Sequence, residues 1–289
     1  MTIPNACLFK CIAVAAVLTS GSAVASPFFF STGNPDGRIG TASRPSTGAP
    51  FEIESADDFV LTSSTALDSA TFTGLIPTGS TVEDVVVEIY RVFPKDSDVG
   101  RTSGPPTFST SQMPTRVNSP SDVALDSRDS AGGTLSFTTS LMGPFSVANS
   151  VQPGGIHPKP GQTTGGNGPA SGDEIQFDVT FATPLVLPAD HYFFVPQVEL
   201  NTGDFLWLSA PRPIVPPGTP FPPGFTDLQS WTRDGMLDPD WLRVGSDIVG
   251  GTTFNATFSV TGNTVPEPAM FALIGTALTA LAACRRRRA

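Results

Sequence analysis

The chain has 289 residues, of which 28 are Gly and 29 are Pro, and only 15% are charged. Because Gly and Pro cost about 1 and 3 kcal/mol in a helix interior, this composition argues against coiled coils and helical bundles. Residues 26–265 hold 25 acidic and 11 basic residues, a net charge of −14. Such a charge repels phosphate backbones, so we expect no nucleic-acid partner. With 39% apolar residues, a body of this size can bury a full core.

Residues 1–25 are typical of a secretory signal peptide. Lys10 precedes an apolar run at residues 11–18, and Ala23 and Ala25 supply the small residues expected before a cleavage point. The run is too short to span a hydrocarbon layer of about 30 Å, which disfavours a permanent N-terminal anchor. We therefore predict cleavage after Ala25.

All three cysteines lie in or beside the terminal apolar segments, at Cys7, Cys11 and Cys284. The body between them therefore has no disulfide, no thiol nucleophile and no Cys-ligated zinc site. The first two cysteines come too early for a lipoprotein cleavage point, which disfavours a lipid anchor.

Residues 265–289 form a tail of three parts. A Pro-Glu-Pro box comes first, sixteen mostly apolar residues follow at 269–284, and four arginines close the tail. As a helix the apolar part measures about 24 Å, a marginal span. Arginines resist crossing a membrane, so export should stall with them in the cytoplasm. The box and the basic end consist of Pro266, Glu267, Pro268, Arg285, Arg286, Arg287 and Arg288.

This tail resembles the PEP-CTERM sorting signal of exosortase substrates. The resemblance implies that the box is recognised, that residues 269–284 are a temporary anchor, and that the arginines set the orientation. It further implies export across the inner membrane of a Gram-negative-type cell, removal of the tail by exosortase, and release or surface attachment, commonly alongside exopolysaccharide. An ordinary tail anchor with a coincidental Pro-Glu-Pro is the alternative. The resemblance covers 25 residues and leaves the activity of the body open.

Alternation of apolar and polar residues predicts strands in the body. Ile175, Phe177, Val179 and Phe181 share one face of a strand, and the same period of two recurs at 254–260 and, more weakly, at 135–141. Further strands are predicted at 51–61, 67–75, 82–93, 191–200, 204–210 and 241–248. Strands with one dry face require two sheets to pack together. We therefore predict an all-β fold, an antiparallel β-sandwich of jelly-roll or related topology, flanked by the signal peptide and a single C-terminal transmembrane helix.

Two segments rich in Gly and Pro interrupt the strands. Residues 143–173 hold thirteen Gly or Pro, and residues 211–224 hold seven Pro and two Gly. Loops of this length are usually functional or disordered, and the second favours an extended polyproline II segment on the surface. The first could separate two subdomains. Because the strand patterns on both sides are alike, we instead expect one domain over residues 26–264.

Motifs of nucleophilic, metalloprotease and nucleotide-binding sites are missing from the sequence. The two histidines, His157 and His191, occur in the first Gly-rich loop and at the start of an apolar strand, so we expect structural roles for both. We predict no catalytic residue, no cofactor and no enzymatic activity.

Paired carboxylates are candidates for a glycosidase site, because that chemistry needs two carboxylates about 5–10 Å apart. The adjacent pairs are Asp57 with Asp58, Glu83 with Asp84, and Asp173 with Glu174. Neighbours on a strand point to opposite faces, so neither partner can assist the other. We expect solvated or loop carboxylates. Asp57 and Asp58 belong to an Ala-Asp-Asp-Phe phrase similar to one found near the start of β-sandwich bodies with this kind of tail.

Two acidic loops are weak candidates for a structural calcium ion, which binds oxygen ligands outside cells. The first contains Asp234, Asp238 and Asp240, and the second contains Asp96 and Asp98. Neither spacing completes a known calcium loop.

Trp231 and Trp241 flank the first acidic loop. If exposed, their rings could stack on a sugar while the carboxylates accept bonds from its hydroxyl groups. Alternatively, both are core residues, which is the commoner role of Trp in a sandwich.

Three classes of function remain. We predict an exported, exosortase-sorted protein of the cell surface or extracellular space, a non-catalytic matrix component that contacts the extracellular polysaccharide. One alternative is a secreted, glycan-active hydrolase on a jelly-roll scaffold, which would need two carboxylates converging in a groove. The other is a partner-binding module that uses the Pro-rich loop at 211–224.

Overall fold

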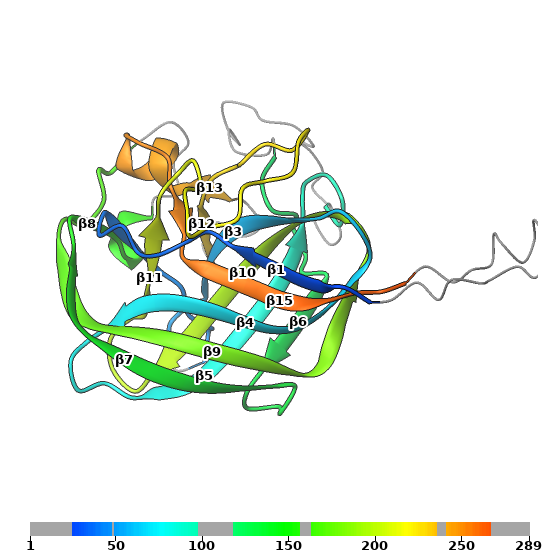
Figure 1. Ribbon diagram of the computed structural model, residues 1–289. Coiled ribbons are helices and arrows are strands. Elements are labelled where there is room, and N and C mark those ends of the chain that lie inside the picture. The colour runs from blue at the N-terminus through cyan, green and yellow to red at the C-terminus, as the bar shows by residue number, and fades with distance from the viewer. Residues whose placement is uncertain (1–24, 48, 98–117, 157–162, 236–240, 267–289) are drawn as a thin grey trace, which may run out of the picture. The chain divides into compact units, whose positions relative to one another are not determined.

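The computed structural model describes residues 25–47, 49–97, 118–156, 163–235 and 241–266. Over these residues the protein is all-β, with two sheets whose strand pairs are antiparallel except for one (Figure 1). Residues 25–265 form one compact unit. No helix of the described part is long and apolar enough to cross a membrane. The expected signal peptide up to residue 24 and the expected transmembrane segment at 269–284 lie outside the described residues.

The larger sheet is organised around one long strand, β4. The sheet consists of β1 (Pro27–Ser31), β2 (Ile39–Ala42), β4 (Thr65–Ile76), β7 (Leu135–Val147), β8 (Asn149–Val151), β9 (Ala170–Leu187), β11 (Leu206–Ala210), β14 (Asn255–Ala256) and β15 (Phe258–Thr264). One edge of β4 pairs with β9, which pairs onward with β7. The other edge pairs with β15 and then with β11. β1 lies beside β15, and β2 joins β11 to β8.

The smaller sheet has the strand order β13-β12-β3-β10-β5-β6. These strands are β3 (Ile53–Leu61), β5 (Val82–Arg91), β6 (Asp126–Asp129), β10 (Asp190–Leu200), β12 (Trp231–Asp234) and β13 (Leu242–Arg243). β3 and β10 are central, and each is buried along most of its length.

Aromatic rings join the two sheets. Phe194 of β10 stacks on Phe258 of β15, with ring centroids 5.0 Å apart and planes 3° apart. Phe59 of β3 meets the same Phe258 edge-on at 6.3 Å. Because these contacts cross between the sheets, the apolar faces predicted from the alternating pattern pack face to face.

The strongest strand predictions are confirmed. Ile175, Phe177, Val179 and Phe181 all point into the core from β9, while the residues between them are more exposed. Most of residues 254–260 likewise lie in β14 and β15. Over the predicted range 135–141 of β7, Leu135 is buried but Leu141 is exposed, which matches the weaker alternation there.

The strand predicted at 241–248 is wrong beyond its first residues. β13 ends at Arg243, and a π-helical turn, η2 (Val244–Val249), follows. The backbone N–H of Arg243 donates to the Asp247 carboxylate at 2.8 Å, which gives the chain a local alternative to sheet pairing. Gly250 then adopts a left-handed conformation and donates its N–H to the Gly245 carbonyl, closing the turn.

The loop predicted at 143–173 is also partly wrong. β7 continues through Gly143 to Val147, and its partner β9 already begins at Ala170. Gly143 has a φ of +129° at a register shift in this pairing, so it bends the strand without ending it. β8 and a short 3₁₀ turn, η1 (Pro153–Gly155), occupy part of the remainder.

The Pro-rich segment 211–224 contains no strand, but it is docked on the sandwich. Ile214 is buried in the core, and the N–H of Thr219 donates to the Ser31 carbonyl at 2.7 Å. Gly218 donates to Val215 at 2.9 Å. Because a polyproline II helix has no internal hydrogen bonds, this turn shows that a continuous polyproline II segment was the wrong prediction.

We expect Phe194→Ala to lower the free energy of unfolding by about 3–5 kcal/mol, because it removes a ring that holds the two sheets together. Val186→Ala, on the exposed side of β9, should change it by less than about 0.5 kcal/mol. Urea denaturation followed by Trp fluorescence measures both. Equal effects of the two substitutions would contradict the assigned core.

Candidate functional site

The outer face of the smaller sheet is buried as well as its inner face. Along β3, Phe59 points to the core between the sheets, whereas Glu54 and Asp58 point to the opposite side, as alternation requires. This opposite side carries its own apolar cluster, formed by Ala56, Tyr90, Phe193, Val195, Trp231 and Trp241, with Val92, Ala124 and Leu228 packed against it. Polar side chains on this face therefore need partners within the protein.

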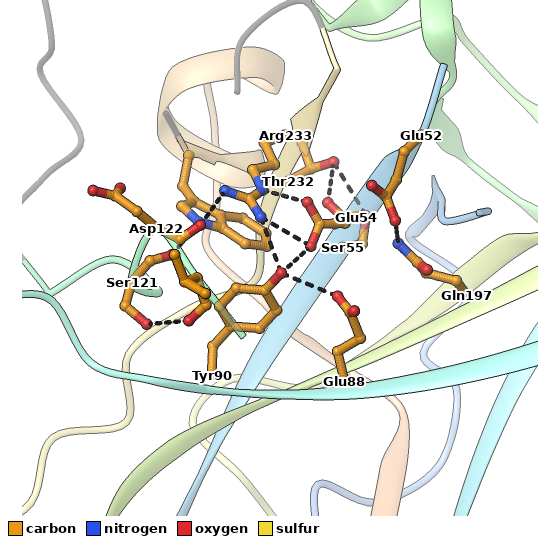
Figure 2. A network of polar contacts seen from close by, with 12 residues as sticks. Glu52, Glu54, Ser55, Glu88, Tyr90, Ser121, Asp122, Gln197, Thr232 and Arg233 are labelled. Carbon is orange, nitrogen blue, oxygen red and sulfur yellow. Dashed lines mark hydrogen bonds and ion pairs between the residues drawn. The ribbon is translucent and has the colours of Figure 1, made fainter. Parts of the chain in front are cut away.

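Glu54 and Arg233 form the centre of a buried polar network (Figure 2). They are directly opposite each other on β3 and β12, and both side chains are 6% exposed. The guanidinium contacts both carboxylate oxygens: Nε binds Oε2, and Nη2 lies 3.1 Å from Oε1. This forked geometry is the favoured way for Arg to bind a carboxylate.

Aromatic rings enclose the same guanidinium. Its carbon lies 4.6 Å from the Trp241 ring centroid and 5.4 Å from that of Tyr90. Arg233 Nη1 also donates to the carbonyl of Asp122 at 3.2 Å, and the Trp241 indole donates to Ser121 at 3.0 Å. The network thus fastens the segment that precedes β6 to the outer face of the sheet.

The Tyr90 hydroxyl and the carboxyl group of Glu88 complete the network. The Tyr90 hydroxyl donates to Glu54, and it lies 3.0 Å from Glu88 Oε2. Burial, and after it the neighbouring Glu54 carboxylate, raise the pKa of Glu88 from 4.5 to about 7. A protonated Glu88 donates to the Tyr90 oxygen, whose own hydrogen is already used. Burial and Glu54 also raise the pKa of Tyr90, so the phenol stays neutral.

Three carboxylates of this face could hold a metal ion. Oxygen atoms of Glu52, Glu54 and Glu88 all lie within 4.8 Å of one another. Arg233 already supplies a positive charge to Glu54, and Gln197 donates an amide hydrogen to Glu52 at 2.7 Å. These contacts account for the cluster as a structural network. The sequence offered no signal for it, because Glu88, Gln197 and Arg233 come from strands other than the one that holds Glu54.

The adjacent acids Asp57 and Asp58 are both buried, which corrects the prediction of solvated carboxylates. Asp57 points between the sheets, where the backbone N–H of Ala256 donates to it. Asp58 points the other way, to His191 Nε2. Burial raises the pKa of both acids, and Asp58 raises that of Asp57 further. Their opposite directions were predicted from strand geometry, and they do exclude an acid–base pair.

His191 is mostly buried and contacts neighbouring side chains of the fold. Its ring is 14% exposed and is surrounded by three phenylalanine rings, those of Phe193, Phe221 and Phe225, at 5.9 to 6.1 Å. The contact with Asp58 joins β10 to β3, and the rings join both strands to the Pro-rich segment.

The remaining candidates for sugar or calcium binding that the structure describes are buried or paired within the protein. Trp231 and Trp241 are 1% and 0% exposed, so neither presents a ring to a sugar, because both pack into the outer apolar cluster. Asp234 is buried at the end of β12, and Asp96 pairs with Arg91. The other candidates lie outside the described residues, namely Ala23, Asp98, His157, Asp238, Asp240, Glu267, Pro268, Arg285, Arg286, Arg287 and Arg288.

A surface groove that the sequence did not indicate crosses the outer face of the larger sheet. It has a volume of about 520 Å³ and spans β1, β15, β4, β9 and β7. Seven hydroxyl or amide side chains line it, and Phe29 and Met142 are exposed in it. Among the described residues that line it, Glu174 is the single carboxylate. This chemistry suits a neutral, hydroxyl-rich ligand.

Comparison with known proteins identifies the tail. The PEP-CTERM protein-sorting motif matches residues 264–288. No curated protein and no solved structure matches the chain. Fold and motif together define an exported all-β protein with a sorting tail. The motif implies processing by exosortase, and with it export through a membrane-anchored precursor stage.

We expect Arg233→Met to destabilise the protein by about 3–5 kcal/mol, because it leaves the Glu54 carboxylate buried without its cation. The control is Arg128→Met, which breaks the more exposed pair with Asp126 and should cost about 1 kcal/mol or less. Adding Glu54→Gln to Arg233→Met should restore part of the loss. Urea denaturation decides this: equal losses for the two Arg variants would refute a central role for the network.

Glu88 should make stability depend on pH. Between pH 4.5 and about 7 the folded protein holds a proton on Glu88 that the unfolded chain has lost, so stability falls as pH rises through this window. The effect is on the order of 3 kcal/mol. Glu88→Gln resembles the protonated acid and should flatten this part of the pH profile of unfolding. An unchanged slope would show that Glu88 titrates normally.

Proposed function

We propose that the protein is a non-catalytic component of the cell surface or extracellular matrix that associates with exopolysaccharide after exosortase has removed its tail. The sorting motif supports the route of export. For the body, the supporting observation is the groove on the larger sheet, whose described lining is rich in hydroxyl and amide groups. We retain the jelly-roll topology as the prediction for this sandwich.

The arrangement of carboxylates favours binding over hydrolysis. A glycosidase needs two carboxyl groups facing one cleft. In the described lining of the groove Glu174 has no such partner, and the buried acids Glu54, Asp57 and Asp58 are engaged in structural contacts. The hydrolase therefore remains the weaker alternative.

The third candidate function was a partner-binding module built on the Pro-rich loop. That function requires an accessible, extended polyproline surface. The docking of Ile214 and Thr219 on the sandwich disfavours it, because part of the loop is committed to the fold.

The route can be tested by fractionating cells with and without exosortase while separate tags follow the body and the tail. We expect the body without its arginine tail at the surface or in the medium of normal cells, and the full-length chain in the membrane when exosortase is absent. Replacing Pro266, Glu267 and Pro268 by Ala should reproduce the second result, because the box is the recognition element of the motif. Full-length chain in the membrane of both strains would contradict sorting.

A further inference from the structure

We propose that the groove on the larger sheet is the polysaccharide site, and that it takes a short run of neutral sugar rings laid across the strands. This inference rests on the proposed function and assigns it to particular residues. The groove lies on the outer face of the sheet, and apart from Phe72 and Phe258 the residues that line it take no part in the core between the sheets.

Hydroxyl groups form a row across the floor of the groove. Ser31 of β1 is opposite Ser259 of β15, and Ser259 is opposite Thr71 of β4. Neighbouring strands are about 4.8 Å apart, a spacing comparable to the length of one sugar ring. The Thr71 and Ser259 hydroxyls lie 2.6 Å apart, and each hydroxyl retains bonding capacity beyond that contact. The row can therefore contact successive sugars.

A second polar row lies beside the first. Thr73 of β4 is opposite Gln176 of β9, which is opposite Ser140 of β7. Thr73 and Gln176 both line the groove. The amide and the hydroxyl can each donate and accept hydrogen bonds, as sugar hydroxyl groups also do.

Apolar contacts are available at the two sides of this floor. Phe29 of β1 is 56% exposed and Met142 of β7 is 59% exposed. Large apolar side chains gain by burial, and the face of an aromatic ring offers a flat platform to the C–H face of a sugar. Phe28 and Phe30, its neighbours on β1, point to the core, so Phe29 is the aromatic ring of this strand that is available to a ligand.

Charge decides which class of polysaccharide fits. Glu174 is the charged side chain of the described lining, and the body carries a net charge of −14 over residues 26–265. A polyuronate would meet repulsion from both sources. A neutral polymer avoids this repulsion and can donate hydroxyl hydrogens to the Glu174 carboxylate. A peptide strand is disfavoured, because strand addition needs the free edge of a sheet and the groove lies on its face.

The test is affinity electrophoresis of the exported protein in gels containing hydroxyethyl cellulose, galactomannan or alginate. We expect a neutral polymer to slow migration and alginate to have no effect. Phe29→Ala should weaken the apparent association at least about tenfold, because it removes the stacking platform. Thr73→Val, which removes one hydroxyl at nearly constant shape, should weaken it less. Val186→Ala is the matched control, since Val186 is an equally exposed apolar residue of the same sheet.

Thermal denaturation of each variant verifies folding, and both groove variants change exposed or half-buried side chains. The groove assignment would be overturned if alginate alone slowed migration or if no polymer did. It would also be overturned if a neutral polymer slowed Phe29→Ala as much as the original protein. In the last case the protein still binds polysaccharide, so the proposed function stands without this site. Failure of the proposed function itself appears instead in the cell fractionation, as a membrane-retained precursor.

Discussion

The structure depends on keeping the outer face of the smaller sheet dry although it carries carboxylates. An uncompensated buried charge costs several kcal/mol. The protein meets this constraint differently at each acid: Arg233 binds Glu54, a raised pKa lets Glu88 hold a proton, and His191 contacts Asp58. Because these partners come from other strands, the charges can be neutralised only when the sheet and its covering segments have closed together.

Sequence patterns predicted the longer strands, because alternation depends on nearest neighbours, but they missed the short strands β1, β2, β6, β8 and β12. The turn at 244–249 differed, since one carboxylate, Asp247, offers the backbone a local partner. The buried acids could not be recognised in this way. Asp58 and His191 are 133 residues apart, and Glu54 and Arg233 are 179 apart. Only the order of strands in the sheet brings such pairs together. Before that order is known, an acidic residue is expected to be exposed to solvent.

The tryptophans show that a sequence can also suggest an exposed ligand contact where the structure has a buried side chain. The size and the acidic neighbours of Trp231 and Trp241 suggest ligand contacts. That same size favours burial, and both rings are buried, with Arg243 over Trp231 and Arg233 over Trp241. Phe29 lies in a strand that was not predicted. In β1, alternation places Phe28 and Phe30 on one face and Phe29 on the other, and the structure leaves Phe29 56% exposed.

The position of β15 connects the body to its sorting tail. This strand lies between β1 and β4 in the larger sheet. At its end, within the part of the chain that the structure describes, the N–H of Thr264 donates to the Ser26 carbonyl at 2.9 Å and the N–H of Val265 donates to the Ser64 carbonyl at 2.8 Å. The matched sorting motif begins at residue 264, where β15 ends. A cut within the motif after Val265 therefore leaves every strand pair of the body in place. A cut several residues earlier would remove part of β15 and expose the edges of β1 and β4, so the fold itself limits how close to the body the tail can be removed.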